Sequence, residues 1–313
     1  MSDGRKLFRT VIVGVDGREG GRDAIALGRL LIGDDGRLVL AHVHSGDSLP
    51  AAAAAVTEGS PPADSVEAAT RDDGSSRRLL ESERERADVE AELKSVGASS
   101  IGEGLHRLVE EEDAELAVVG SSHRGFLGRV FLGDDTRASL NGAPCAIAVA
   151  PLGYAQTLGG VRVVGVGYDG SAESDAALAL ARQFAAERGA TVRALRVVQI
   201  LSSAYAGFGG VAWGDALETV LADAKQQMES LEGVDGDAVL GVAGEELAAF
   251  GERVGLLVVG SRGYGPVKTL MLGSTSQYLA SHARCPLLVL PRVSEGVAAS
   301  DAQGTQASAA SSA

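Results

Sequence analysis

The chain has 313 residues, of which 45% are hydrophobic and only 4% aromatic, a composition typical of a globular protein with room for two domains. Its formal net charge of -14 excludes a general nucleic-acid binder, because neutralising phosphates requires a basic face. It contains no apolar run of about 18 residues, and residues 1–10 lack the apolar core of a signal peptide. We therefore expect no membrane partner and a cytoplasmic location.

The first half of the chain predicts five strands, the third of them weak. The apolar runs that carry this prediction are residues 9–16, 37–44, 88–96, 115–120 and 145–151. Residues 45–65 are rich in Ala, Ser and Pro and predict a mobile loop. The acidic run at 81–92 predicts a solvent-exposed helix face.

The second half predicts the same alternation of strands and helices. The predicted strands are residues 161–168, 191–198, 237–243, 256–260 and 286–291, and the predicted helices are 171–189, 216–233, 245–254 and 274–283. Strands that are separated by helices imply right-handed crossovers and a parallel, doubly wound sheet. We predict an α/β protein with two tandem Rossmann-like domains, each a five-stranded, mainly parallel sheet flanked by helices.

An internal repeat sets the domain organisation. Residues 116–151 and 256–291 align without a gap and are identical at 12 of 36 positions, including both cysteines, Cys145 and Cys285. An earlier block aligns Asp16 with Asp169. We read the chain as a tandem duplication, with domain 1 at 1–152, domain 2 at 160–293 and a disordered tail at 294–313. Both cysteines are expected to be buried and unreactive.

Sequence features of the second copy would meet at the carboxyl edge of such a sheet, where ligands bind. Asp169 ends the first strand of this copy, and Val197 lies near the end of the second. Gly260 and Gly263 predict a tight turn after the fourth strand. Gly273 and Ser274 open the next helix, whose free N–H groups favour a phosphate, and Ser274 with Gln277 fits a capping box.

The spacing Gly260, two residues, Gly263, nine residues, Gly273-Ser274 resembles the ATP-binding signature of the universal stress protein family. The segments "VGYDGS" and "CPLLVLP", which open and close the second copy, resemble that family too. The resemblance covers both copies and implies an adenine nucleotide α-hydrolase-like fold. It also implies a site for ATP, or for ADP or AMP, with Mg²⁺ or Mn²⁺ on the phosphates.

The same resemblance assigns roles to residues of the second copy. Asp169 would hold the ribose or reach a phosphate-bound metal, and the backbone of Val197 would meet the adenine. The residues that would line the phosphates and ribose are Gly260, Ser261, Gly263, Gly273, Ser274 and Thr275.

The first copy departs from the signature, so we expect it to bind nucleotide weakly or not at all. Its equivalent candidates are Asp16, Val43, Gly120, Ser121 and Gly133. His123 stands in the place of Gly263, and Asp134 in the place of Ser274 puts a carboxylate where a phosphate would sit.

Three functions remain open from the sequence. The first is a nucleotide-binding stress-response or signalling module with little or no turnover, which we favour. The second is a slow ATP hydrolase, although no Walker motif is present and we assign no catalytic residue. The third is a structural or chaperone-like protein with no nucleotide. The apolar final strands predict an intramolecular pseudo-dimer in which they pair with each other, and further homodimerisation stays open.

Overall fold

A computed structural model describes most of both copies. It covers residues 7–45, 63–121, 130, 141–157, 160–199, 210–261, 270 and 272–292. The predicted tail at 294–313 and most of the predicted loop at 45–65 lie outside these residues. The last three residues of that loop belong instead to a helix that begins at Ala63.

The first copy forms five strands and three described helices. They are β1 (Phe8–Gly14), α1 (Glu19–Leu31), β2 (Ile32–Ser45), α3 (Ala63–Ala87), β3 (Glu92–Ala98), α4 (Ile101–Glu111), β4 (Leu116–Gly120) and β5 (Ala146–Ala150). The short 3₁₀ turn η1 (Tyr154–Gln156) lies between the copies.

The second copy repeats this order with one more described helix. Its elements are β6 (Val163–Gly167), α6 (Ala172–Arg188), β7 (Thr191–Val198), α7 (Gly210–Glu229), β8 (Asp235–Leu240), α8 (Ala243–Gly251), β9 (Leu256–Gly260), α9 (Ser274–His282) and β10 (Leu287–Leu290). Helix α6 is bounded as its sequence predicts. Ser171 caps its N-terminus by accepting from the N–H of Ser174, and Gly189 ends it in the left-handed conformation.

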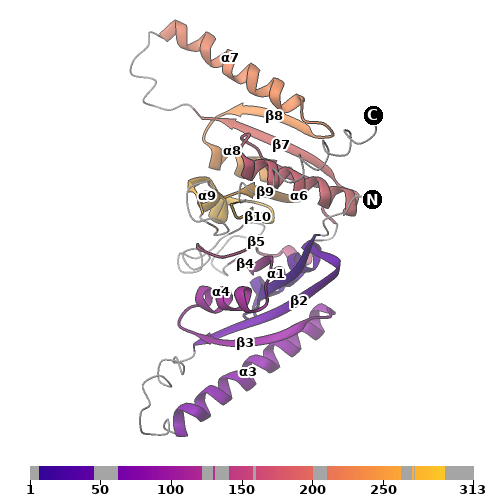
Figure 1. Cartoon of the computed structure of the whole chain (residues 1–313), viewed down its shortest axis with the longest axis vertical. Helices are drawn as coiled ribbons and strands as arrows, with labels where there is room; N and C mark the ends of the chain where they lie inside the picture. The colour runs from indigo at the N-terminus through magenta and orange to yellow at the C-terminus, as the bar shows by residue number, and fades with distance from the viewer. Residues whose placement is uncertain are drawn as a thin grey trace, which may run out of the picture.

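All ten strands form one sheet, in the order β3-β2-β1-β4-β5-β10-β9-β6-β7-β8. Strands within each copy are parallel, which confirms the predicted doubly wound fold class. At the centre β5 and β10 pair antiparallel, with Ala148 opposite Leu288. Figure 1 shows the copies stacked along the long axis of the molecule, with α3 and α7 at opposite ends.

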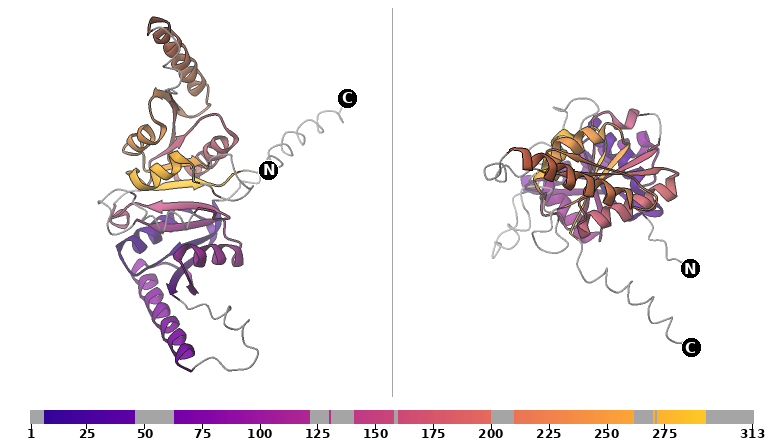
Figure 2. Two further views of the ribbon diagram at one scale, coloured as in Figure 1. Left: turned by 90° about the vertical axis from the view of Figure 1, so that its left-hand side faces the viewer. Right: turned by 90° about the horizontal axis from the view of Figure 1, so that it is seen from above.

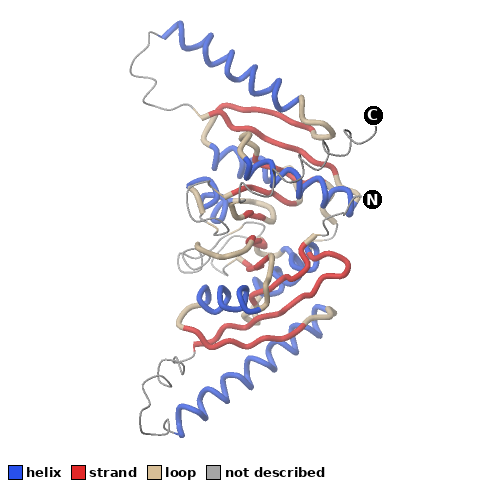
Figure 3. Tube along the Cα trace, in the orientation of Figure 1, coloured by secondary structure: helices blue, strands red, loops and turns tan. Residues whose placement is uncertain are grey.

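Helices cover both faces of the sheet (Figures 2 and 3). One apolar cluster joins α1, α3, α6 and α7 to one face, and a second joins α4, α8 and α9 to the other. Each cluster contains residues of both copies, so the core is continuous across the central strand pair. The central strands β4, β5, β9 and β10 are almost wholly buried, which explains their unbroken apolar runs.

The weak third strand of the first copy is present as β3, at one edge of the sheet. An edge strand has one neighbour, so its side chains are less buried and its sequence is less apolar. Polar groups hold it instead: Lys94 and Arg37 both pair with Glu112, at 2.7 Å each. The same ion pairs lower the pKa of the Glu112 carboxyl, through Lys94 first and then Arg37.

Candidate functional site

A pocket of about 470 Å³ lies at the carboxyl ends of β6, β7 and β9 in the second copy. Strand β6 lies between β7 and β9, so this is the place where the chain order of the strands reverses and where open α/β sheets bind ligands. The predicted site residues that line the pocket are Asp169, Val197, Gly260, Ser261 and Thr275. Gly273 and Ser274 directly precede Thr275 in the chain, whereas Gly263 lies outside the described residues.

Sequence reasoning missed about two thirds of the lining residues. The other lining side chains come from several elements: Tyr168, Ser171, Glu173, Ser174, Leu195, Gln199, Ala243, Leu247, Val259 and Ser276. Ser171, Glu173 and Ser174 could have been found, because they occupy the turn that follows Asp169. Ala243 is the first residue of α8 and Leu247 lies one turn later, and nothing in their sequence marks them as site residues.

Asp169 organises the turn between β6 and α6. Its Oδ1 accepts the backbone N–H of Ser171 at 3.0 Å and the hydroxyl of the same residue at 2.5 Å. Burial alone would raise the pKa of Asp169, but these hydrogen bonds outweigh it and hold the pKa below its ordinary value. Asp16 of the first copy makes the matching bond to the N–H of Arg18 at 3.0 Å. Both aspartates therefore have a structural role in the turn.

The backbone of Val197 faces the pocket. The β6–β7 ladder ends where Gly167 lies opposite Leu195, and the N–H of Tyr168 then donates to the Leu195 carbonyl at 3.0 Å. Alternate residues of a parallel strand direct their N–H and C=O groups to the same neighbour. The amide groups of Val197 therefore point to the β6 side beyond the end of β6. Val43 occupies the same position relative to β1, because Gly14 lies opposite Ala41.

Ser261 carries a buried hydroxyl that has no hydrogen-bond partner within the described structure, although the residue is only 3% exposed. Its backbone is fixed, since its N–H donates to the Leu290 carbonyl at 2.8 Å. Ser121 of the first copy has the same backbone bond to Ala150, but its hydroxyl also donates to that carbonyl, at 2.7 Å. Buried polar groups are nearly always paired, so the unpaired hydroxyl in the pocket indicates a place for a ligand.

Gly260 and Gly120 are required by packing as well. A Cβ on Gly260 would lie 2.6 Å from Cβ of Glu173 and 2.9 Å from its carbonyl carbon. A Cβ on Gly120 would collide with the carbonyl oxygen of Gly20. These glycines let the helix after the first strand of each copy pack against the end of the fourth strand.

Helix α9 begins at the edge of the pocket. Gly273 is its N-cap residue and no side chain caps it, so the predicted capping box of Ser274 and Gln277 is wrong. Ser274 is the first helical residue and is exposed. The N–H groups in the first turn of a helix are suited to an anion, and Gly273 has no side chain that could compete for them.

Glu173 adds a second carboxylate to the pocket, and its Cβ and backbone lie beside Gly260. Its carboxylate forms an ion pair with Arg292, whose Nε lies 3.9 Å from Oε1 of Glu173. Arg292 lies two residues after the end of β10. In the first copy the equivalent position is Gly20. The pocket therefore combines an ion pair, an aspartate turn and a free hydroxyl at one strand edge.

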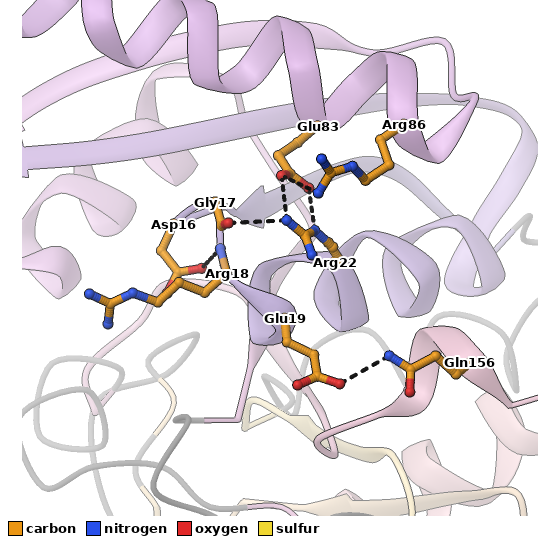
Figure 4. A network of polar contacts seen from close by, with 8 residues as sticks. All are labelled: Asp16, Gly17, Arg18, Glu19, Arg22, Glu83, Arg86 and Gln156. Carbon is orange, nitrogen blue, oxygen red and sulfur yellow. Dashed lines mark hydrogen bonds and ion pairs between the residues drawn. The ribbon is translucent and has the colours of Figure 1, made fainter.

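Helix α3 contacts α1 beside the matching turn of the first copy (Figure 4). Glu83 of α3 is 4% exposed and accepts two hydrogen bonds from Arg22 of α1, at 2.9 and 3.1 Å. Arg22 also donates to the Gly17 carbonyl beside Asp16, at 3.3 Å. Leu79 of α3 packs directly over Gly17. The prediction that the acidic run is a solvated face is thus wrong at Glu83, because α3 packs on α1.

Helix α7 leaves more room in the second copy. A hollow of about 360 Å³ lies between α7 and β7, and it shares Asp169, Val197 and Gln199 with the main pocket. Gln227 of α7 stands opposite Gly170, where Leu79 stands over Gly17 in the first copy. The two copies therefore differ in how the helix before the third strand meets the aspartate turn.

We expect Glu83→Ala to lower the free energy of unfolding by about 1–2 kcal/mol, because it removes the buried partner of a half-exposed arginine. Urea unfolding would measure the change. Glu81→Ala is the control, since Glu81 pairs with Arg77 on the exposed side of the same helix and should cost under about 0.5 kcal/mol. Equal effects of the two substitutions would contradict the structural role of Glu83.

Neither cysteine gives a second candidate site. Cys145 and Cys285 are buried, as predicted, and burial raises the pKa of each thiol to about 12. Within the described ranges, no three His, Cys, Asp or Glu side chains gather closely enough to hold a metal ion. No described helix is long and apolar enough to cross a membrane.

Comparisons with known proteins agree with this architecture. The profile of the universal stress protein family matches residues 7–151 and again residues 160–291. Universal stress protein Rv2319c of Mycobacterium tuberculosis is 28% identical over 202 residues, which cover 61% of this chain and 69% of the relative. A universal stress protein of Thermus aquaticus is 34% identical over 131 residues, covering 39% of this chain and 93% of its own. A universal stress protein structure from Archaeoglobus fulgidus superposes with a TM-score of 0.61 at 16% identity, covering 91% of this chain and 98% of its own.

Proposed function

The chain belongs to the universal stress protein family as a tandem protein, and we propose that its second copy binds adenine nucleotide, with ATP as the main ligand. The observation that carries this proposal is the buried, unpartnered hydroxyl of Ser261 in a pocket at the strand-order reversal. The protein would act as a stress-response or signalling module in the cytoplasm, with little or no turnover. We place its domains at 1–152 and 160–293.

The pocket suggests how each part of the nucleotide would lie. The adenine would meet the outward N–H and C=O groups of Val197, and the ribose would lie against Asp169. The phosphates would lie between Gly260-Ser261 and the first turn of α9, near Gly273, Ser274 and Thr275. This arrangement puts the anion at a helix N-terminus.

The two carboxylates of the pocket favour a nucleotide that carries a divalent cation. Asp169 and Glu173 both line the pocket, and oxygen ligands are those that Mg²⁺ and Mn²⁺ prefer. Such an ion would offset the repulsion between these carboxylates and the phosphates. The lowered pKa of Asp169 also makes it a weak general base, which favours binding over hydrolysis.

We infer that the first copy contributes structure and not a nucleotide site. The hydroxyl of Ser121 donates to the Ala150 carbonyl, and Leu79 of α3 packs over Gly17 in the Asp16 turn. Val43, Gly120 and Asp16 lie at places in the fold that match Val197, Gly260 and Asp169, whereas Gly133 lies outside the described residues. The paired final strands join this copy to the second as an intramolecular pseudo-dimer.

Matched serine substitutions test the proposal. Ser261→Ala should weaken ATP binding by about tenfold, because it removes a hydrogen bond to a charged or polar ligand group, while stability is unchanged. Ser121→Ala should leave ATP binding unchanged and lower the free energy of unfolding by about 1 kcal/mol, because it removes a made bond. Calorimetric titration with ATP and Mg²⁺, together with urea unfolding, measures both.

The outcome separates three functions. Failure of the wild-type chain to bind ATP would leave a structural or chaperone-like role. Release of inorganic phosphate in a single-turnover assay would establish slow hydrolysis. Binding without release supports the module proposed here.

A further inference from the structure

The chain that leads into α9 is hydrogen-bonded to the first copy. The N–H of Leu270 donates to the Ala143 carbonyl at 2.8 Å, and the N–H of Gly142 donates back to the Leu270 carbonyl at 2.8 Å. Two residues later the N–H of Leu272 donates to the side-chain Oδ1 of Asn141 at 3.0 Å. Three hydrogen bonds with residues 141–143 thus fix Leu270 and Leu272, which lie three residues and one residue before Gly273.

We call residues 141–143 with Leu270 and Leu272 the seam between the copies, and this seam is tightly packed. Leu270 is fully buried and Ala143 almost so, and both lie in the apolar cluster that spans the two copies. Gly142 has a φ of 94°, a left-handed conformation that favours glycine. The seam therefore has little freedom to shift at these residues.

The seam is nearly symmetric between the copies. The N–H of Val130, which aligns with Leu270, donates to the Ala283 carbonyl at 2.8 Å, and Ala283 aligns with Ala143. Each copy therefore holds one aligned residue of the other, Leu270 through Ala143 and Val130 through Ala283. The residue types differ at the position of the side-chain bond, because Asn141 aligns with Ser281.

We propose that Asn141 is a positioning residue for the nucleotide site of the second copy, an inference that rests on the function proposed above. By fixing Leu272, Asn141 sets where Gly273 and the first turn of α9 stand relative to Ser261. Ser261 is itself tied to β10 through Leu290, so both sides of the phosphate position are fixed before a ligand arrives. Preorganised donors bind more tightly because less freedom is lost on binding. The first copy is in this sense part of the second copy's site.

The test uses the full-length chain and three variants. Asn141→Ala should raise the Kd for ATP with Mg²⁺ by about fivefold, because one hydrogen bond that orders the site is lost. Ser281→Ala, the matched change at the aligned position of the second copy, should leave that Kd unchanged. Asn141→Asp keeps the acceptor oxygen for Leu272. Thermal unfolding midpoints should agree among all variants within a few degrees.

Amide hydrogen exchange in the protein without ligand gives an independent readout. Asn141→Ala should speed the exchange of Leu272 and of the first turn of α9 by about tenfold, while Val130 stays as slow as in the wild type. Asn141→Asp should restore the slow exchange of Leu272. Unchanged exchange at Leu272 in Asn141→Ala, or an equal loss of ATP affinity in Ser281→Ala, would overturn the proposal.

Failure of the two ideas can be told apart. If the wild-type chain does not bind ATP, the proposed function fails, whereas the exchange data still show whether Asn141 orders the start of α9. If ATP binds and Asn141→Ala binds it as tightly as the wild type does, only the positioning role fails.

Discussion

Ser274→Asp should lower the affinity for ATP by about a hundredfold while the fold stays intact. At an effective dielectric constant near 20, two unit charges about 4 Å apart repel by roughly 4 kcal/mol, and exposure to solvent reduces this value. Ser274 is exposed at the first position of α9, where a carboxylate favours the helix through its dipole. The substitution therefore acts on the phosphates and not on stability.

The change also gives the second copy the residue that the first copy has at this position, because Asp134 aligns with Ser274. Calorimetric titration with ATP and Mg²⁺ would measure the loss, and Ser274→Asn is the uncharged control, which should bind within about threefold of the wild type. Equal affinities of the aspartate and asparagine variants would show that no phosphate lies near the start of α9. The nucleotide placement proposed here would then be wrong.

Asp23→Ala should lower the free energy of unfolding by about 2–4 kcal/mol, because it removes a buried carboxylate together with the two backbone hydrogen bonds that this carboxylate accepts. Asp23 of α1 is fully buried, and its two oxygens accept the N–H of Gly153 at 2.8 Å and that of Ala155 at 2.7 Å. These donors belong to the segment that joins the copies. Urea unfolding would measure the loss, which should reach both copies because their cores are continuous.

The control for Asp23 lies one turn earlier on the same helix. Glu19 is exposed and accepts from the side chain of Gln156 at 3.0 Å. Glu19→Ala removes this exposed contact to the same segment and should cost under about 0.5 kcal/mol. A loss in Glu19→Ala as large as that in Asp23→Ala would contradict the assigned role of the buried carboxylate.

Asp23 also predicts a pH dependence of stability. Burial raises the pKa of this carboxyl above its ordinary 3.8, although the two N–H bonds pull the pKa down. Since the folded pKa lies above the unfolded one, the stability contributed by this proton is complete below pH 3.8 and is lost as the pH rises through the folded pKa. The difference in the free energy of unfolding between wild type and Asp23→Asn would be measured from pH 3.5 to 7. This difference should change between pH 3.8 and the folded pKa of Asp23, and it should be constant above that pKa.

Much of this protein could be predicted from its sequence. The unbroken apolar runs of β4, β5, β9 and β10 mark strands buried on both faces, and Gly189 marks the end of α6, because burial and backbone freedom act locally. The internal repeat predicted two copies of one fold. Asp169, Gly260 and Ser261 were predicted at one strand edge, since parallel strands bring their carboxyl ends together.

Tertiary structure decided what pattern alone could not. The acidic run gave no sign that Glu83 is buried against Arg22, because that contact depends on how α3 packs on α1. Ser274 looked like a helix cap, yet the cap is Gly273, which depends on where the chain leaves the seam at Leu272. Ser121 and Ser261 both follow the sequence VVG, but only the hydroxyl of Ser121 is paired within the described structure. Local sequence sets which elements form, whereas contacts between distant elements decide which polar groups stay available for a ligand.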